Sequence, residues 1–166
     1  MTDKEKTELI RLLGMCEPGA LPEEVFIAFA RLTVLPAIEF VPLRYNEGHI
    51  EVLLIERPAS DPIWPGMLHT PGTVLRSNDK TAQDAFDRLL HEELIVDGKY
   101  TMTFNGWSFV HIKRGAGVTL EYIIQLAQQP LHGKYYPYDK LPNNFIEDQQ
   151  DMVGRAVETF RRSLKK

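Results

Sequence analysis

Hydrophobic and polar positions divide the chain into helical ends and a middle that alternates between strand and helix. Residues 2–15 predict a short helix, because four apolar side chains cluster ahead of Gly14, a common helix stop. A second helix is expected from Pro22, since proline suits a first helical position and acidic residues suit the first turn. Its apolar positions recur at helical spacing and are expected in the core: Val25, Phe26, Ala28, Phe29 and Leu32.

Strand-like patterns follow at residues 33–45 and 49–57, separated by the turn Asn46-Glu47-Gly48. Pro36 and Pro42 cannot donate backbone hydrogen bonds. We therefore expect the first strand to be broken or to lie at a sheet edge. Residues 58–78 then read as a long loop, and a loop of this length in a compact domain is more often functional than idle.

The remaining chain predicts a central helix, two strands and a final helix. The central helix is expected over residues 81–95, with Thr81 as its cap and an apolar stripe behind it. Strands are expected at residues 100–112 and 118–127, and the last helix at residues 147–164. Because strands precede and follow one central helix, the pattern favours an α/β (α+β) fold built as a sandwich.

Composition narrows the class of protein further. The 166 residues fit one compact domain, and the net charge of −4 offers no basic surface for a nucleic-acid backbone. No apolar run is long enough to cross a membrane, and no signal peptide is evident at the start. The single cysteine, Cys16, excludes an internal disulfide. We expect a cytoplasmic protein with no nucleic-acid or membrane partner.

The segment from Ile63 to Val96 carries the candidate chemistry. It runs from an aromatic loop through Pro71-Gly72 into a helix that bears Arg88 and the pair Glu92-Glu93. This segment resembles the box of the Nudix hydrolase family, and the resemblance extends over about residues 37–160. It implies a Nudix-like α/β/α sandwich with a mixed sheet over residues 35–166, preceded by a helical extension over residues 1–34.

The resemblance also implies a metal site and its ligands. Glu92 and Glu93 would bind Mg²⁺ or Mn²⁺ and take part in catalysis, and the Gly72 carbonyl would complete the site. Arg88 would order the two carboxylates. An ordinary salt bridge from Arg88 to Glu92, one helical turn away, is the simpler interpretation and is compatible with that role.

Three positions depart from the family pattern. Thr73 stands where the box opens with glycine, Leu89 where it has a glutamate, and Ile95 where it has a second glycine. On an α-helix, residues 89, 92 and 93 share a face, so Leu89 removes one of three carboxylates. We expect Leu89 to pack in the core. A replacement acid could come from Asp79 or Glu121, although a turn residue and a polar sheet position explain these two equally well or better.

Three further residues are candidates for substrate binding. Arg57 ends a predicted strand, while Trp64 and His69 lie in the long loop. Arg57 and His69 could contact phosphate, and Trp64 could stack on a base. Ordinary alternatives are an aromatic anchor for the loop and a surface histidine.

Two classes of function fit these residues. The first is a divalent-metal-dependent Nudix-type hydrolase of a nucleoside diphosphate linked to another group, weakened by the loss at Leu89. The second is a Nudix-fold protein that binds a nucleotide or a partner without cleaving it. A possible homodimer, or a protein-interaction role for the N-terminal helices, is also compatible with the sequence.

Overall fold

The structure is a computed structural model that describes residues 1–17, 19, 21–96 and 98–165. Its middle layer is a mixed sheet of seven strands in the order β3-β2-β1-β6-β5, with β4 added beside β1 and β7 beside β2. The strands are β1 (Val34–Asn46), β2 (His49–Glu56), β3 (Leu68–His69), β4 (Gly72–Val74), β5 (Tyr100–Ile112), β6 (Gly115–Leu126) and β7 (Lys134–Pro137). Strand β1 runs parallel to β6 and antiparallel to β2 and β4.

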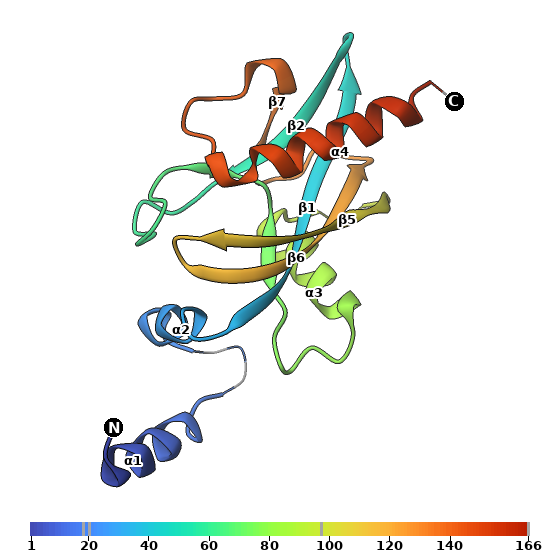
Figure 1. Cartoon of the computed structure of the whole chain (residues 1–166). Helices are drawn as coiled ribbons and strands as arrows, with labels where there is room; N and C mark the ends of the chain where they lie inside the picture. Colours follow the sequence, from blue (N-terminus) through green and yellow to red (C-terminus); the bar gives the residue numbers. More distant parts are fainter. Residues whose placement is uncertain (18, 20, 97, 166) are drawn as a thin grey trace.

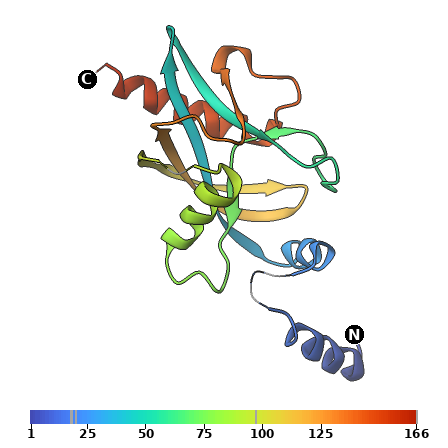
Figure 2. The ribbon, with the colours of Figure 1, turned by 180° about the vertical axis from the view of Figure 1, so that it is seen from behind.

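Helices cover both faces of this sheet (Figures 1 and 2). The chain begins with α1 (Asp3–Leu13) and α2 (Glu23–Ala30), and the central helix is α3 (Ala82–Arg88) followed directly by the π-helical turn η1 (Leu89–Glu93). The 3₁₀ turns η2 (Tyr138–Lys140) and η3 (Glu147–Gln149) lead into α4 (Gln150–Ser163). The α/β/α sandwich with a mixed sheet is therefore confirmed.

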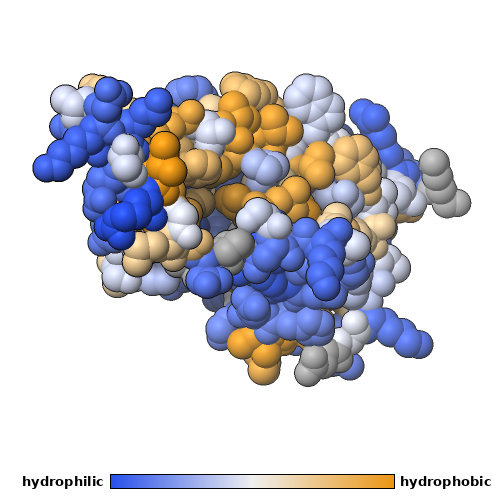
Figure 3. Space-filling view, turned by 90° about the horizontal axis from the view of Figure 1, so that it is seen from below, coloured by the Kyte–Doolittle hydropathy of each residue, from blue (hydrophilic) through white to orange (hydrophobic). Residues whose placement is uncertain are grey.

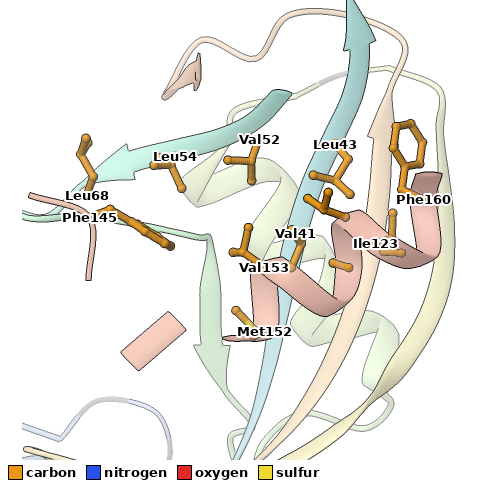
Figure 4. Packing of buried hydrophobic residues seen from close by; sticks show 12 residues of the cluster. Val41, Leu43, Val52, Leu54, Leu68, Ile123, Phe145, Met152, Val153 and Phe160 are labelled. Atoms are coloured by element: carbon orange, nitrogen blue, oxygen red, sulfur yellow. The ribbon is translucent and has the colours of Figure 1, made fainter. Parts of the chain in front are cut away.

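Alternation along β1 divides the core between the two faces. Odd-numbered residues such as Val41 and Leu43 pack under α4, and even-numbered ones such as Ile38 and Phe40 pack against α3 and η1. Figure 4 shows the first cluster, in which side chains of α4 lie over the sheet. Its members are Val41, Leu43, Val52, Leu54, Leu68, Ile123, Phe145, Met152, Val153, Ala156, Val157 and Phe160.

The expectation that Pro36 and Pro42 break β1 or place it at an edge is wrong, because β1 is continuous and has neighbours on both sides. Pro36 O accepts from Leu75 N–H, and Phe40 N–H donates to Pro71 O, so the even-numbered backbone groups point away from β6. The prolines therefore remove no bond to β6. Pro42 also lies where β1 changes its other partner from β4 to β2.

The expected loop over residues 58–78 contains two short strands, β3 and β4. The predicted core face of the second helix is also only partly correct. Phe26 is partly buried, but Val25, Phe29 and Leu32 are 38%, 47% and 85% exposed. The end of α2 contacts the β5–β6 hairpin at Ala30, while several of its apolar side chains remain exposed.

Helix α1 buries no residue, although its capping box is formed by Thr2 and Glu5. Its apolar side chains Leu9, Ile10, Leu12 and Leu13 are all exposed. Viewed from the side where the N-terminal helices lie, hydrophobic residues interrupt an otherwise hydrophilic surface (Figure 3). No described helix is long and apolar enough to span a bilayer.

Leu89 is fully buried in the core cluster that α3 and η1 form against the sheet, as expected. Restoring the family glutamate here should therefore damage the fold rather than complete a site. We expect Leu89→Glu to lower the free energy of unfolding by about 3–5 kcal/mol, the usual cost of an unpaired buried charge. Urea denaturation measures this, with Leu89→Met as the volume-matched control that should cost less than about 1.5 kcal/mol. An equally stable Leu89→Glu protein would contradict the assignment.

Candidate functional site

The centre of the candidate site is the carboxyl group of Glu39, on the α4 face of β1. Thr70 Oγ1 donates to Glu39 Oε2 at 3.2 Å, and Gln149 Nε2 donates to the same oxygen at 3.4 Å. Gln149 also accepts from the Thr70 backbone N–H at 2.9 Å. These bonds connect β1, the loop after β3 and the turn before α4, so they fix the carboxyl at the junction of three segments.

Gly72 allows the backbone to approach this carboxyl closely. A Cβ atom at position 72 would lie 2.2 Å from Glu39 Cδ and 2.3–2.4 Å from its two oxygens. Any larger residue would therefore displace Glu39. The Gly72 backbone N–H also donates to Glu93, so one glycine places two carboxyl groups near the same point.

Both of these carboxyl groups hold their protons unusually strongly. Burial raises the pKa of Glu39 to about 8, and the nearby charge of Glu93 adds to the effect. Burial likewise raises the pKa of Glu93 to about 7, although Arg57 and the Gly72 N–H oppose the shift. At neutral pH the pair therefore carries less than two negative charges.

The turn η1 decides which acid of the Glu92-Glu93 pair enters the site. Leu94 N–H donates to Leu89 O at 3.0 Å, a five-residue step that makes this turn wider than an α-helical one. Glu93 is consequently directed inward toward Gly72, while Glu92 remains exposed. The expected shared face of residues 89, 92 and 93 is not formed, because that expectation assumed α-helical spacing.

Arg88 does not bridge to Glu92 but binds Asp79 with two nitrogens, one of them at 3.0 Å from Oδ2. Its Nη2 also donates to Val74 O at 3.3 Å. Asp79 is nearly buried in this pair, and Arg88 holds the pKa of Asp79 below its usual range. Arg88 thus fastens the loop before α3 to β4, and Asp79 is committed to that contact.

Arg57 and Trp64 form one side of the site. Arg57 makes a close ion pair with Asp61, with its Nε 2.6 Å and Nη2 2.5 Å from Oδ2. The backbone N–H of Trp64 donates to the same carboxylate at 2.8 Å. Arg57 Cζ lies 5.7 Å from the centroid of the Trp64 indole ring. Since Trp64 is only 7% exposed, its geometry matches the loop-anchor alternative better than an open stacking platform.

His69 and Glu121 are both buried, and their environments differ. Burial and the charge of Arg57 lower the pKa of His69 to about 4, so its ring is neutral at physiological pH. Glu121 lies beside Glu39 in the β1–β6 register and binds Arg155 Nη2 at 2.5 Å. Arg155 is half exposed, so Glu121 is neutralised from the surface side of the site.

Several of the groups described above border a cavity of about 300 Å³, which lies between β1, the β5–β6 hairpin and the start of α4. Its polar lining includes Glu39, Arg57, His69, Arg114 and Arg155. Its floor near the hairpin is made of small residues, which leave room above the sheet: Ala37, Ala116, Gly117 and Thr119. The volume and mixed lining suit a small molecule that combines an apolar part with charged groups.

The sequence resemblance implies a divalent cation at this site. No three His, Cys, Asp or Glu side chains gather as a metal cluster within the described ranges. Glu39 and Glu93 nevertheless fit a two-carboxylate Mg²⁺ site, because that ion commonly retains waters and takes other ligands from phosphate. Their raised pKa values also indicate a place where a positive charge would be favourable.

Of the residues expected from the sequence, Glu93, Gly72 and Arg57 lie at this site, whereas Glu39, Arg114 and Thr70 were not among the expected residues. Glu39 had a signal in the sequence, because an acid within the apolar run Ala37–Leu43 is unusual. Arg114 and Thr70 had none, since polar residues in turns are usual. Glu92 is exposed, although its charge still acts on Glu93, and Arg88 is paired with Asp79.

Solved structures that resemble this chain include Nudix domain proteins. The Nudix domain of NrtR from Shewanella oneidensis, in complex with ADP ribose, matches with a TM-score of 0.61 at 19% identity, over 96% of this chain and 99% of that chain. Ap4A hydrolase from C. elegans matches with a TM-score of 0.59 at 18% identity, over 78% and 99%. A MutT Nudix hydrolase from Burkholderia pseudomallei gives 0.59 at 17%, over 74% and 98%.

The chain therefore has the Nudix fold, as the resemblance in its sequence implied. It spans less than two thirds of a longer NrtR structure, covering 63% of that chain, and 62% of an NrtR chain crystallised with a 27mer DNA. No protein-family model matches the sequence, and no curated protein does either. The similarity to these solved structures establishes the fold of the present chain. The ligands named for them belong to those proteins alone.

The raised pKa values of Glu39 and Glu93 predict how stability depends on pH. Unfolded glutamates ionise near pH 4.5, whereas the folded protein keeps these two protons up to about pH 8 and 7. The folded state thus binds more protons in between, so its stability decreases as pH rises toward 8. His69, with its lowered pKa, has the opposite effect but only below about pH 6.5.

We therefore expect the free energy of unfolding, measured in EDTA, to fall between pH 6.5 and 8.5 in the wild type. Glu39→Gln should flatten this fall, because an amide cannot ionise. Urea denaturation at several pH values measures both slopes, and the exposed-site variant Glu92→Gln serves as the control. Identical slopes in the wild type and Glu39→Gln would show that Glu39 ionises normally.

Proposed function

We propose that the cavity binds a compound built on a nucleoside diphosphate, and that recognition rather than rapid hydrolysis is its main activity. The observation that carries this proposal is the charge inside the cavity. Arg57 and Arg155 are each neutralised by a carboxylate, whereas Arg114 has no ion pair among the described residues. Arg114 therefore offers the cavity a positive charge that can bind an anionic group of a ligand.

The size and lining of the cavity support this ligand class. A diphosphate would lie near Arg114, and the flat parts of the compound would occupy the space above Ala37 and Gly117. Nudix domain proteins with this fold include one in complex with ADP ribose and one that is an Ap4A hydrolase. Both names denote compounds in which a chain of phosphates joins a nucleoside to another group. Such an anionic compound is compatible with a cavity that Arg114 lines.

Metal-dependent hydrolysis is the second candidate, and the Glu39–Glu93 pair favours it. These two carboxylates would hold Mg²⁺ or Mn²⁺, which supplies charge neutralisation and an activated water when bound. Leu89 offers no base, Glu121 is tied to Arg155, and Glu92 faces solvent. The missing general base is worth about 10²–10⁴ in rate, so turnover through this site would be slow.

Calorimetry with ADP-ribose, Ap4A and nucleoside triphosphates tests the proposal, with each compound also incubated with Mg²⁺ and assayed for released phosphate products. We expect binding of at least one compound with little turnover. Arg114→Ala should weaken binding about tenfold or more, because hydrogen bonds to a charged group contribute about 1.5–3 kcal/mol. Arg162→Ala, on the exposed last turn of α4, is the matched control.

Binding and hydrolysis separate clearly in this design. Turnover that Glu93→Gln abolishes while binding persists would make the protein a hydrolase and overturn the emphasis on recognition. Failure of the wild type to bind any compound of the panel, with or without Mg²⁺, would remove the nucleotide proposal altogether.

A further inference from the structure

Arg114 differs from the other arginines around the cavity in how its charge is balanced. It lies in the turn between β5 and β6 and borders both the site cavity and a second cavity against the N-terminal segment. Burial and repulsion from Arg57 lower its pKa. The charges of Asp61, Glu39 and Glu23 oppose this shift, but none of these carboxylates forms an ion pair with Arg114 among the residues that the structure describes. Something other than an ion pair therefore holds this side chain in place.

Two aromatic rings from separate segments provide that support. Arg114 Cζ lies 5.6 Å from the Trp64 ring centroid and 5.7 Å from the Phe26 ring centroid. Cations at such distances from ring faces are attracted by the ring quadrupole. Trp64 belongs to the loop after β2, and Phe26 belongs to α2. Helix α2 therefore contributes directly to the placement of this charge.

The hairpin backbone is fitted to the same helix. Gly115 has a φ of +146°, and a Cβ atom there would lie 2.3 Å from Ala30 O at the end of α2. Only glycine allows the turn and the helix to come this close. Figures 1 and 2 both place α2 beside the tip of the β5–β6 hairpin. The residue next to Arg114 is thus a fixed contact between α2 and the hairpin.

We infer that α2 is a structural wall of the ligand site, and that Phe26 is a positioning residue which directs Arg114 toward a phosphate of the bound compound. This inference rests on the proposed nucleotide-binding function and deepens it. It assigns helix α2 to recognition of the anion and not to a separate protein-interaction module. Phe26 itself touches Arg114 and not the ligand, so its effect on binding passes through the guanidinium.

A double-mutant cycle on the full chain tests this coupling, with ADP-ribose as the probe and adenosine as the probe without phosphate. Arg114→Ala should weaken ADP-ribose binding about tenfold or more, and Phe26→Ala about three- to tenfold, as expected for a charged contact and its positioning partner. In the Arg114→Ala background, Phe26→Ala should have no further effect. Neither variant should change adenosine binding.

Val25→Ala, on the same helix but away from Arg114, is the matched control and should bind like the wild type. Phe26→Tyr keeps a ring beside the guanidinium and should restore most of the affinity. Thermal denaturation of each variant verifies folding, and a misfolded Phe26→Ala would be replaced in the cycle by Phe26→Leu.

The outcomes distinguish this inference from the proposed function beneath it. A wild-type protein that binds no nucleotide would sink the proposed function itself. Binding that is intact in Phe26→Ala and Phe26→Leu, or a loss that is fully additive with Arg114→Ala, would overturn the role of α2 alone. An equal loss of adenosine affinity would show that Phe26 shapes the cavity in general and does not act through Arg114.

Discussion

The close approach of Gly72 to the carboxyl group of Glu39 is the constraint on which the site depends. It can exist only because position 72 has no side chain and because β4 pairs with β1 at this point. The same glycine donates its N–H to Glu93, so strand pairing and helix placement converge on one backbone group. The pKa values of both acids are raised because the carboxyl groups are shielded from water, and the Gly72 N–H only opposes this shift at Glu93.

Many of the charged side chains in and around the site form ion pairs with one another. Asp61 takes up Arg57, Asp79 takes up Arg88, and Arg155 takes up Glu121. Two other groups line the cavity: the carboxyl of Glu39, which readily accepts a proton or a cation, and Arg114, which is supported by two aromatic rings. Such a site has the means to recognise a phosphate compound, while the groups that would speed its cleavage are scarce.

Most of the fold was accessible from the sequence because it depends on apolar periodicity. The final helix, the β5–β6 hairpin and the burial of Leu89 follow from patterns that the structure reproduces. Pro42 misled because a missing donor matters only where a strand needs it, which depends on the neighbouring strand. Phe29 misled because helical periodicity identifies an apolar face without specifying what covers it. The side chains that contact Arg114 and Glu39 come from segments distant in sequence, and a local sequence pattern cannot predict such long-range contacts.

The wide turn at Leu89–Glu93 has a consequence for how this chain compares with others letter by letter. A π turn holds one residue more than an α turn, so it behaves like a single-residue insertion absorbed into a helix. Of the two adjacent acids, Glu93 lies next to Gly72 and Glu92 is exposed to solvent. Two neighbouring acids can thus differ in their surroundings although the sequence alone does not distinguish them.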